Sequence, residues 1–179
     1  MKPTCVLGIL DTPRGHEIAK GMLEWLRPIY NVYPVIHNGQ QFELPALQRA
    51  RNLAFADEPV LYLHTRGAVN TYNTTAPTHR MWREEFGHQW QKYYDILLQH
   101  SKPLVLSPFV DNNRTTRYNG IFANAAAWQR AILEPTKERH DYEHIWRGDD
   151  ETKVLGMLVH AKENRIEDIR DFLLLNYGK

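Results

Sequence analysis

The sequence contains a single cysteine, Cys5, among its 179 residues, so no disulfide can form within the chain. Cys5 lies inside an apolar run, which is typical of a buried, unreactive thiol. A chain without disulfides is suited to a reducing compartment. The N-terminus lacks the pattern of a signal peptide, and no run approaches the ~18 apolar residues of a membrane helix. These absences predict a cytoplasmic protein without a transmembrane segment.

An excess of charge of one sign is also absent, because 22 Lys and Arg residues stand against 21 Asp and Glu residues. Nucleic-acid-binding proteins usually carry a basic excess on one face, so this balance argues against a nucleic-acid partner. The sequence has no G-x-G-x-x-G fingerprint, no G-x-x-x-x-G-K-[ST] loop and no G-x-S-x-G elbow. It therefore gives no support to a dinucleotide-binding, P-loop or serine-hydrolase function.

Apolar runs and helical patterns alternate along the chain. Short apolar runs predict buried strands at Thr4–Leu10 and at residues 32–36, 60–63 and 104–109, with a further extended segment at 118–124. Helical spacing predicts helices at residues 15–30, 44–56, about 77–97, 125–133, 142–146, 151–160 and 166–175. This order predicts an α/β fold: a single Rossmann-like layered domain over residues 1–179, with a mostly parallel central sheet flanked by helices.

Polar segments follow three of the predicted strands, at residues 11–14, 64–73 and 111–117. Because the carboxyl ends of parallel strands meet at one edge of a sheet, and ligands bind beyond that edge, these segments mark a candidate site. Residues 64–67 (HTRG) combine an imidazole, a hydroxyl and a guanidinium, which can all donate hydrogen bonds to a diphosphate. A strand-to-loop corner with a solvated arginine is an equally open interpretation of this segment.

Two later segments carry further candidates. Asn119 and Gly120 form a turn dipeptide between aromatic and apolar residues, which is typical of a hairpin corner or of a pocket floor. Asp141 and Glu143 lie beside two histidines, and either carboxylate could act as a general base. The same segment matches H-x-x-E-H through His140, Glu143 and His144, so a zinc hydrolase is a further alternative.

Four segments in this order resemble a known family: VLYLHTRGAVN, WREEF, RYNGIFANAAAW and DYEHIW. Together they cover about residues 53–146 and are similar to bacterial glycosyltransferases of the glycosyltransferase-A type, including polysaccharide and rhamnan-synthesis-like enzymes. The resemblance implies transfer of a sugar from a nucleotide-diphosphate donor to a hydroxyl acceptor, either a glycan or a lipid-linked molecule. It also implies a single displacement with inversion at the anomeric carbon.

The resemblance implies a role for each candidate residue. Glu143 or Asp141 would deprotonate the acceptor hydroxyl. The donor and its nucleotide would be bound by Thr12, Arg14, His64, Thr65, Arg66, Gly67, Asn119 and Gly120.

The family usually carries Asp-x-Asp, a metal-binding pair, where this chain has His64–Thr65–Arg66. Carboxylates suit Mg²⁺ or Mn²⁺, whereas this triplet does not. Either His64 and Arg66 neutralise the diphosphate directly, or a metal is held elsewhere, with Asp111 as the candidate ligand. The missing Asp-x-Asp also leaves open a non-catalytic protein of this family that binds a sugar or a nucleotide.

Overall fold

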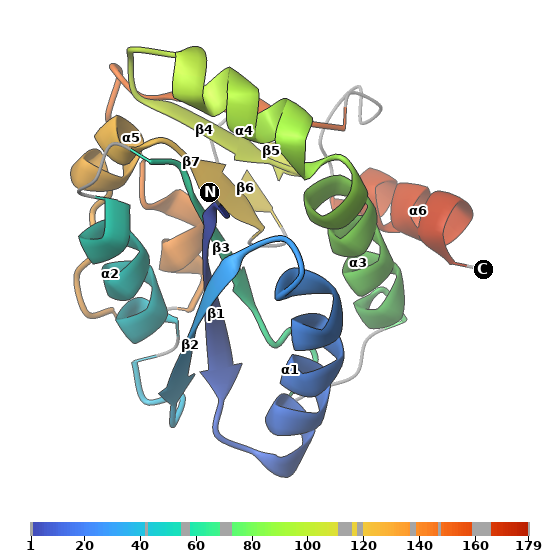
Figure 1. Ribbon diagram of the computed structural model, residues 1–179. Coiled ribbons are helices and arrows are strands. Elements are labelled where there is room, and N and C mark those ends of the chain that lie inside the picture. The colour runs from blue at the N-terminus through green and yellow to red at the C-terminus, as the bar shows by residue number, and fades with distance from the viewer. Residues whose placement is uncertain are drawn as a thin grey trace.

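A computed structural model describes residues 2–41, 43–54, 58–68, 73–110, 116–117, 120–136, 139–146, 148–158 and 166–178, without the side chains of residues 117, 139–141 and 166–168. Within these residues the chain forms a six-stranded sheet between two layers of helices (Figure 1). This arrangement confirms the predicted α/β fold with a mostly parallel central sheet. None of the described helices is long and apolar enough to cross a membrane.

The sheet has the strand order β2-β1-β3-β7-β4-β8. Its strands are β1 (Thr4–Leu10), β2 (Asn31–His37), β3 (Val60–His64), β4 (Leu104–Ser107), β7 (Ile121–Ala123) and β8 (Lys153–Gly156). The pairs β1–β2, β1–β3 and β4–β8 are parallel, while β7 is antiparallel to both β3 and β4. Every strand except β7 therefore ends at the same edge of the sheet.

Helices cover both faces of the sheet. The helical elements are α1 (Pro13–Leu26), α2 (Leu44–Leu53), α3 (Thr75–Trp82), the π-helical segment η2 (Arg83–His88), α4 (Trp90–Gln99), α5 (Ala125–Arg130), the 3-10 helix η3 (Arg139–His144) and α6 (Ile166–Tyr177). Buried side chains of α1, α3, η2, α4 and α6 form one core, and those of α2, α5 and η3 form the other. A short hairpin, β5 (Phe109–Val110) with β6 (Thr116–Arg117), follows β4.

The first strand shows why these runs form a central sheet. Cys5 and Leu7 pack into one core, whereas Val6 between them packs into the other. A strand that is buried on both faces must be apolar at every position, which explains the continuous apolar run. The Cys5 thiol is fully buried, and burial raises its pKa, in agreement with the prediction of an unreactive thiol.

The end of β1 turns directly into α1. The Thr12 side chain accepts a hydrogen bond from the Gly15 N–H at 3.0 Å, and Pro13 occupies the first helical turn. A Cβ atom at Gly15 would lie 2.0 Å from the Leu10 carbonyl oxygen, so the turn admits only glycine at this position. Local sequence therefore determines where this helix begins.

The prediction of a helix at residues 151–160 is wrong, because Lys153–Gly156 is a strand. Its backbone pairs with β4: the Lys153 N–H donates to Pro103 O at 3.0 Å, and the Met157 N–H donates to Ser107 O at 2.8 Å. Without β8, the outer edge of β4 would have unpaired backbone groups. Pairing with a distant strand has overridden the local helical spacing.

The predicted long helix at residues 77–97 is divided into α3, η2 and α4. The apolar stripe itself is confirmed, since Trp82, Phe86, Trp90, Tyr93 and Leu97 all pack into one core or against it. The π-helical turn between the two α-helices brings the Glu85 carboxylate inside. There it accepts hydrogen bonds from the phenol groups of Tyr93 at 2.5 Å and of Tyr177, on α6, at 3.3 Å.

Candidate functional site

The ends of β1 and β3 are joined at the carboxyl edge of the sheet. The Leu10 N–H donates to Thr65 Oγ1 at 3.1 Å, and the Thr65 N–H donates to Gly8 O at 2.9 Å. The segments that begin at Asp11 and at His64 therefore meet, as predicted from the polar residues after these strands. Residues 111–115, in the third polar segment, lie outside the described residues, although the hairpin strands on either side of them are in place.

Three of the predicted donor-binding residues shape this edge. Thr12 caps α1, and Thr65 connects β1 to β3. Gly67 has φ +87°, and a Cβ atom there would lie 2.5 Å from Thr75 Cγ2. The side chains of Thr12 and Thr65 are thus engaged in structural hydrogen bonds, whereas Arg14 is exposed on the first turn of α1.

His64, the last residue of β3, lies beside a carboxylate that the sequence did not reveal. His64 Nδ1 is 3.9 Å from Glu43 Oε1, and each side chain is 5% exposed. Glu43 directly precedes α2 but makes no capping hydrogen bond with its side chain. The pair places a buried carboxylate beside a buried imidazole at the end of the strand.

Trp82 lies between two histidines. The His64 ring meets it edge-on, with centroids 5.6 Å apart and an interplanar angle of 67°, whereas His79 stacks on it at 5.5 Å and 25°. Trp82 is fully buried, and its Nε1 has no hydrogen-bond partner among the described residues. A Cβ atom at Gly120 would lie 2.6 Å from that nitrogen. The predicted residues His64 and Gly120 therefore meet at one tryptophan side chain.

His79 has the opposite electrostatic environment to that of His64. Burial, and then the charge of the Arg66 guanidinium, lower the pKa of His79 to about 4, although a hydrogen bond to the Arg66 backbone partly offsets this. His79 is therefore neutral near pH 7. Sequence reasoning missed it, because a histidine followed by an arginine in a helix is typical of a solvated face. Its proximity to Arg66 depends on how α3 packs against the end of β3.

Glu143, the predicted general base, is half-buried in η3. Its carbonyl oxygen accepts a hydrogen bond from Thr116 Oγ1 at 3.3 Å, which places η3 against the β5–β6 hairpin. The Asp141 and His140 side chains lie outside the described residues, as do Asn119 and Asp111. Within the described part of the chain, no group of three or more His, Cys, Asp or Glu residues could hold a metal ion.

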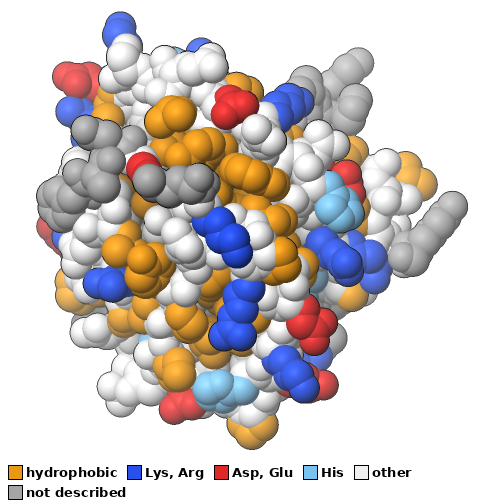
Figure 2. Space-filling model, viewed as in Figure 1, with side chains coloured by type: hydrophobic (Ala, Val, Ile, Leu, Met, Phe, Trp, Pro, Cys, Tyr) orange, Lys and Arg blue, Asp and Glu red, His pale blue; other side chains and the backbone are white. Residues whose placement is uncertain are grey.

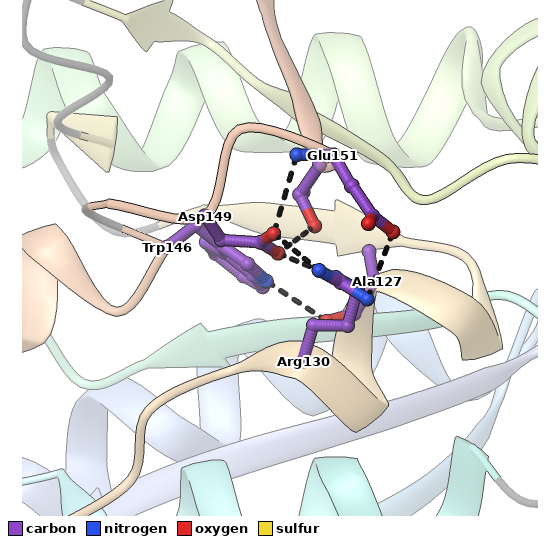
Figure 3. Close-up of polar contacts among 6 residues, drawn as sticks. Ala127, Arg130, Trp146, Asp149 and Glu151 are labelled. Atoms are coloured by element: carbon purple, nitrogen blue, oxygen red, sulfur yellow. Dashed lines mark hydrogen bonds and ion pairs between the residues drawn. The ribbon is translucent and has the colours of Figure 1, made fainter.

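A polar cluster anchors the chain immediately after η3 (Figure 3). Arg130 on α5 binds the Asp149 carboxylate through two hydrogen bonds of 2.7 Å, and these bonds hold the pKa of Asp149 well below its usual range. Arg130 also pairs with Glu151 at 3.1 Å. The Trp146 indole donates to Ala127 O at 2.9 Å. This cluster joins the segment that carries Glu143 to α5 and to the start of β8.

A separate hollow of about 610 Å³ runs along α1, between its exposed side and the end of β1. Apolar side chains gather near the centre of the face seen in Figure 2, with Lys and Arg side chains among them. The hollow is lined by Ile9, His16, Ala19, Lys20, Leu23, Glu24, Arg27 and Pro28. None of these residues belongs to the predicted site, so the hollow and the strand-end cluster are distinct features.

Comparison with known proteins finds no matching family, no matching curated protein and no matching solved structure.

Proposed function

We propose that this chain is a glycosyltransferase of the glycosyltransferase-A type, which transfers a sugar from a nucleotide-diphosphate donor to a hydroxyl acceptor. The observation that carries the proposal is the meeting of His64 and Gly120 at Trp82, with Arg66 interacting with the His79 ring that stacks on the same tryptophan, at the edge where α/β sheets bind ligands. The ordered motifs at the strand ends support the same family. The acceptor is a glycan or a lipid-linked hydroxyl compound.

The proposed chemistry is a single displacement. The acceptor hydroxyl oxygen attacks the anomeric carbon while the bond between that carbon and the diphosphate oxygen breaks, which inverts the configuration. Glu143 or Asp141 takes the hydroxyl proton, and the nucleoside diphosphate leaves with the bonding electrons. Negative charge grows on the leaving oxygen, so the Arg66 guanidinium and a hydrogen bond from the His64 ring stabilise the transition state more than the ground state.

Charge neutralisation by side chains replaces the metal-binding carboxylates that the family usually has. The described residues contain no group of three or more His, Cys, Asp or Glu side chains that could hold a metal ion, and Asp111 is the candidate ligand for Mg²⁺ or Mn²⁺. Arg66 is a cation just beyond the end of β3, and the His64 ring, two residues before it in the sequence, can donate a hydrogen bond.

Thermal unfolding of the full chain with UDP-, GDP- and dTDP-sugars, with and without Mn²⁺, tests the donor assignment. A ligand that binds the native state at 100 times its Kd adds about 2.7 kcal/mol of stability, so at least one donor should raise Tm clearly. Arg66→Gln should abolish the shift, and Arg170→Gln, on the exposed side of α6, should retain it. If no donor raises Tm under either condition, the proposal is wrong.

A non-catalytic sugar- or nucleotide-binding protein is the second candidate. It is favoured by the structural engagement of Thr12 and Thr65 and by the burial of His64. Release of nucleoside diphosphate from a bound donor, in the presence of simple glycan acceptors, separates the two functions. Release that Glu143→Gln abolishes, with donor binding intact, supports the enzyme. Binding without any release supports the second candidate.

A further inference from the structure

The two ring nitrogens of His79 have different surroundings. Nε2 is buried and has no hydrogen-bond partner among the described residues, while the ring hydrogen-bonds to the Arg66 backbone. That bond raises the pKa of His79, so the ring donates and the Arg66 carbonyl accepts. Because Nε2 has no partner, the donating atom is Nδ1. A neutral imidazole has one N–H and one lone pair, so Nε2 carries the lone pair.

The protonation state of this ring is set by the Arg66 side chain and by burial. Both disfavour the charged imidazole, which leaves His79 neutral at neutral pH. His79 is therefore suited to accept a hydrogen bond from a hydroxyl group, and it is not suited to bind a phosphate by charge. The Arg66 guanidinium, in contrast, is suited to bind a phosphate group.

Trp82 supplies a donor within the same stack. Its ring lies 5.5 Å from His79 at an angle of 25°, which fixes the orientation of the imidazole. Its Nε1–H can only donate, and it is also buried without a partner among the described residues. Native proteins leave few buried polar atoms unpaired, and each exception calls for a bound water, ion or ligand. The stack and Arg66 together combine a cation, a donor and an acceptor.

We propose that His79 Nε2 accepts a hydrogen bond from a sugar or ribose hydroxyl of a ligand whose phosphate group binds Arg66. The ligand class is a phosphate that carries a polyhydroxyl ring, and His79 distinguishes it from a bare phosphate. The binding of a phosphate group by Arg66 rests on the proposed function. The binding of a hydroxyl group by His79 rests on the ring nitrogens of His79 and Trp82 that have no partner among the described residues.

Nitrogen NMR of the histidine side chains tests the proposal on the intact chain. In the free protein at pH 7, His79 should show the Nδ1–H form with an unprotonated Nε2. Glucose 1-phosphate, UDP and inorganic pyrophosphate are the probes. At least one of the two hydroxyl-bearing probes should move the Nε2 signal toward the protonated value, and which one does so identifies the hydroxyl as that of a sugar or of a ribose. Pyrophosphate should leave the signal in place.

Affinity measurements on variants complete the test. For the probe that moves the Nε2 signal, His79→Phe should lower the binding affinity about tenfold, because one neutral hydrogen bond contributes about 1 kcal/mol or slightly more. The affinity for pyrophosphate should not change. His79→Gln, which retains an acceptor, should recover part of the loss and confirms that the site is not merely disrupted. Arg66→Gln should lower the affinity for every probe that binds the unmodified chain.

The outcomes separate this inference from the proposed function. If nucleotide sugars bind but the Nε2 signal does not move, or if Nε2 carries the proton in the free protein, the role of His79 is wrong while the proposed function stands. If glucose 1-phosphate moves the signal and no nucleotide sugar binds, the proposed function fails and the role of His79 stands. Absence of binding by every probe overturns the inference.

Discussion

The surroundings of His64 and His79 differ although both rings contact the same tryptophan. His64 lies 3.9 Å from the Glu43 carboxylate in a site that is 5% exposed, whereas His79 lies beside the Arg66 guanidinium. Burial, and then the Arg66 guanidinium, lower the pKa of His79 and favour its neutral form. In many sites, two titratable residues have different roles because their surroundings favour different protonation states.

Under the proposed function, His64 would contact the diphosphate and His79 would accept a hydrogen bond from a hydroxyl group of the ligand. Trp82 separates the rings, and Gly120 packs against Trp82. The following substitutions test whether the two environments are as different as the geometry indicates.

The largest effect is expected on the His64 side. His64→Phe removes the imidazole from beside a buried carboxylate and should lower the free energy of unfolding by about 3 kcal/mol. The double variant Glu43→Leu/His64→Phe should lose less stability than this single variant, because it leaves no buried carboxylate without its partner. Urea unfolding of the four proteins of this cycle measures the coupling. Additive losses would show that Glu43 and His64 are not a pair.

A smaller effect is expected at the tryptophan between the rings. Gly120→Ala places a methyl group 2.6 Å from Trp82 Nε1 and 2.8 Å from Phe86 Cε2, and both rings are fully buried. The loss should be about 1–3 kcal/mol, as is typical of overpacked cores. Gly21→Ala is the matched control: nothing lies within 4 Å of its new methyl group, and it should stabilise α1 by about 0.5–1 kcal/mol. Equal effects at the two glycines would contradict the packing around Trp82.

The smallest effect at neutral pH is expected at His79. His79→Phe removes the hydrogen bond from the imidazole to the Arg66 backbone but keeps a ring of similar shape, so the free energy of unfolding should fall by about 1 kcal/mol. The difference should also depend on pH. The pKa of His79 is about 4 in the folded protein, below about 6.5 in an unfolded chain. The unfolded state therefore binds more protons between these values, and native stability is lost as pH falls from about 6.5 toward 4.

His79→Phe should reduce the slope of the free energy of unfolding against pH by up to ~1.4 kcal/mol per pH unit, which corresponds to one proton. Arg66→Gln should flatten it only in part, because burial is the larger cause of the lowered pKa. Urea unfolding at several values between pH 7.5 and 4.5 provides the measurement. An unchanged slope in His79→Phe would show that the ring is not held neutral.

Much of the fold could be predicted from local pattern. The bounds of β1 match the prediction, and those of β2 and β3 differ from it by one residue at one or both ends. These strands are apolar over their whole length or end at turn residues, and such signals are local. The strand β8 could not be found in this way, because it exists through pairing with β4.

The candidate site was only partly predictable. The polar segments after β1 and β3 indicated its edge correctly, since parallel strands must end together. Thr12 and Thr65 were predicted to bind the donor, but in the structure their side chains cap a helix and connect two strands. Glu43 and His79 were missed, because an acidic residue before a helix and a histidine within one are both common surface patterns.

The sequence by itself determined the α/β layering, the edge where polar residues gather and the start of α1, because apolar periodicity and capping act over a few residues. Only the tertiary structure decided which histidine faces a carboxylate and which faces a guanidinium. That choice depends on Glu43 reaching His64 and on α3 carrying His79 to Arg66, across distances in the chain that no local pattern records.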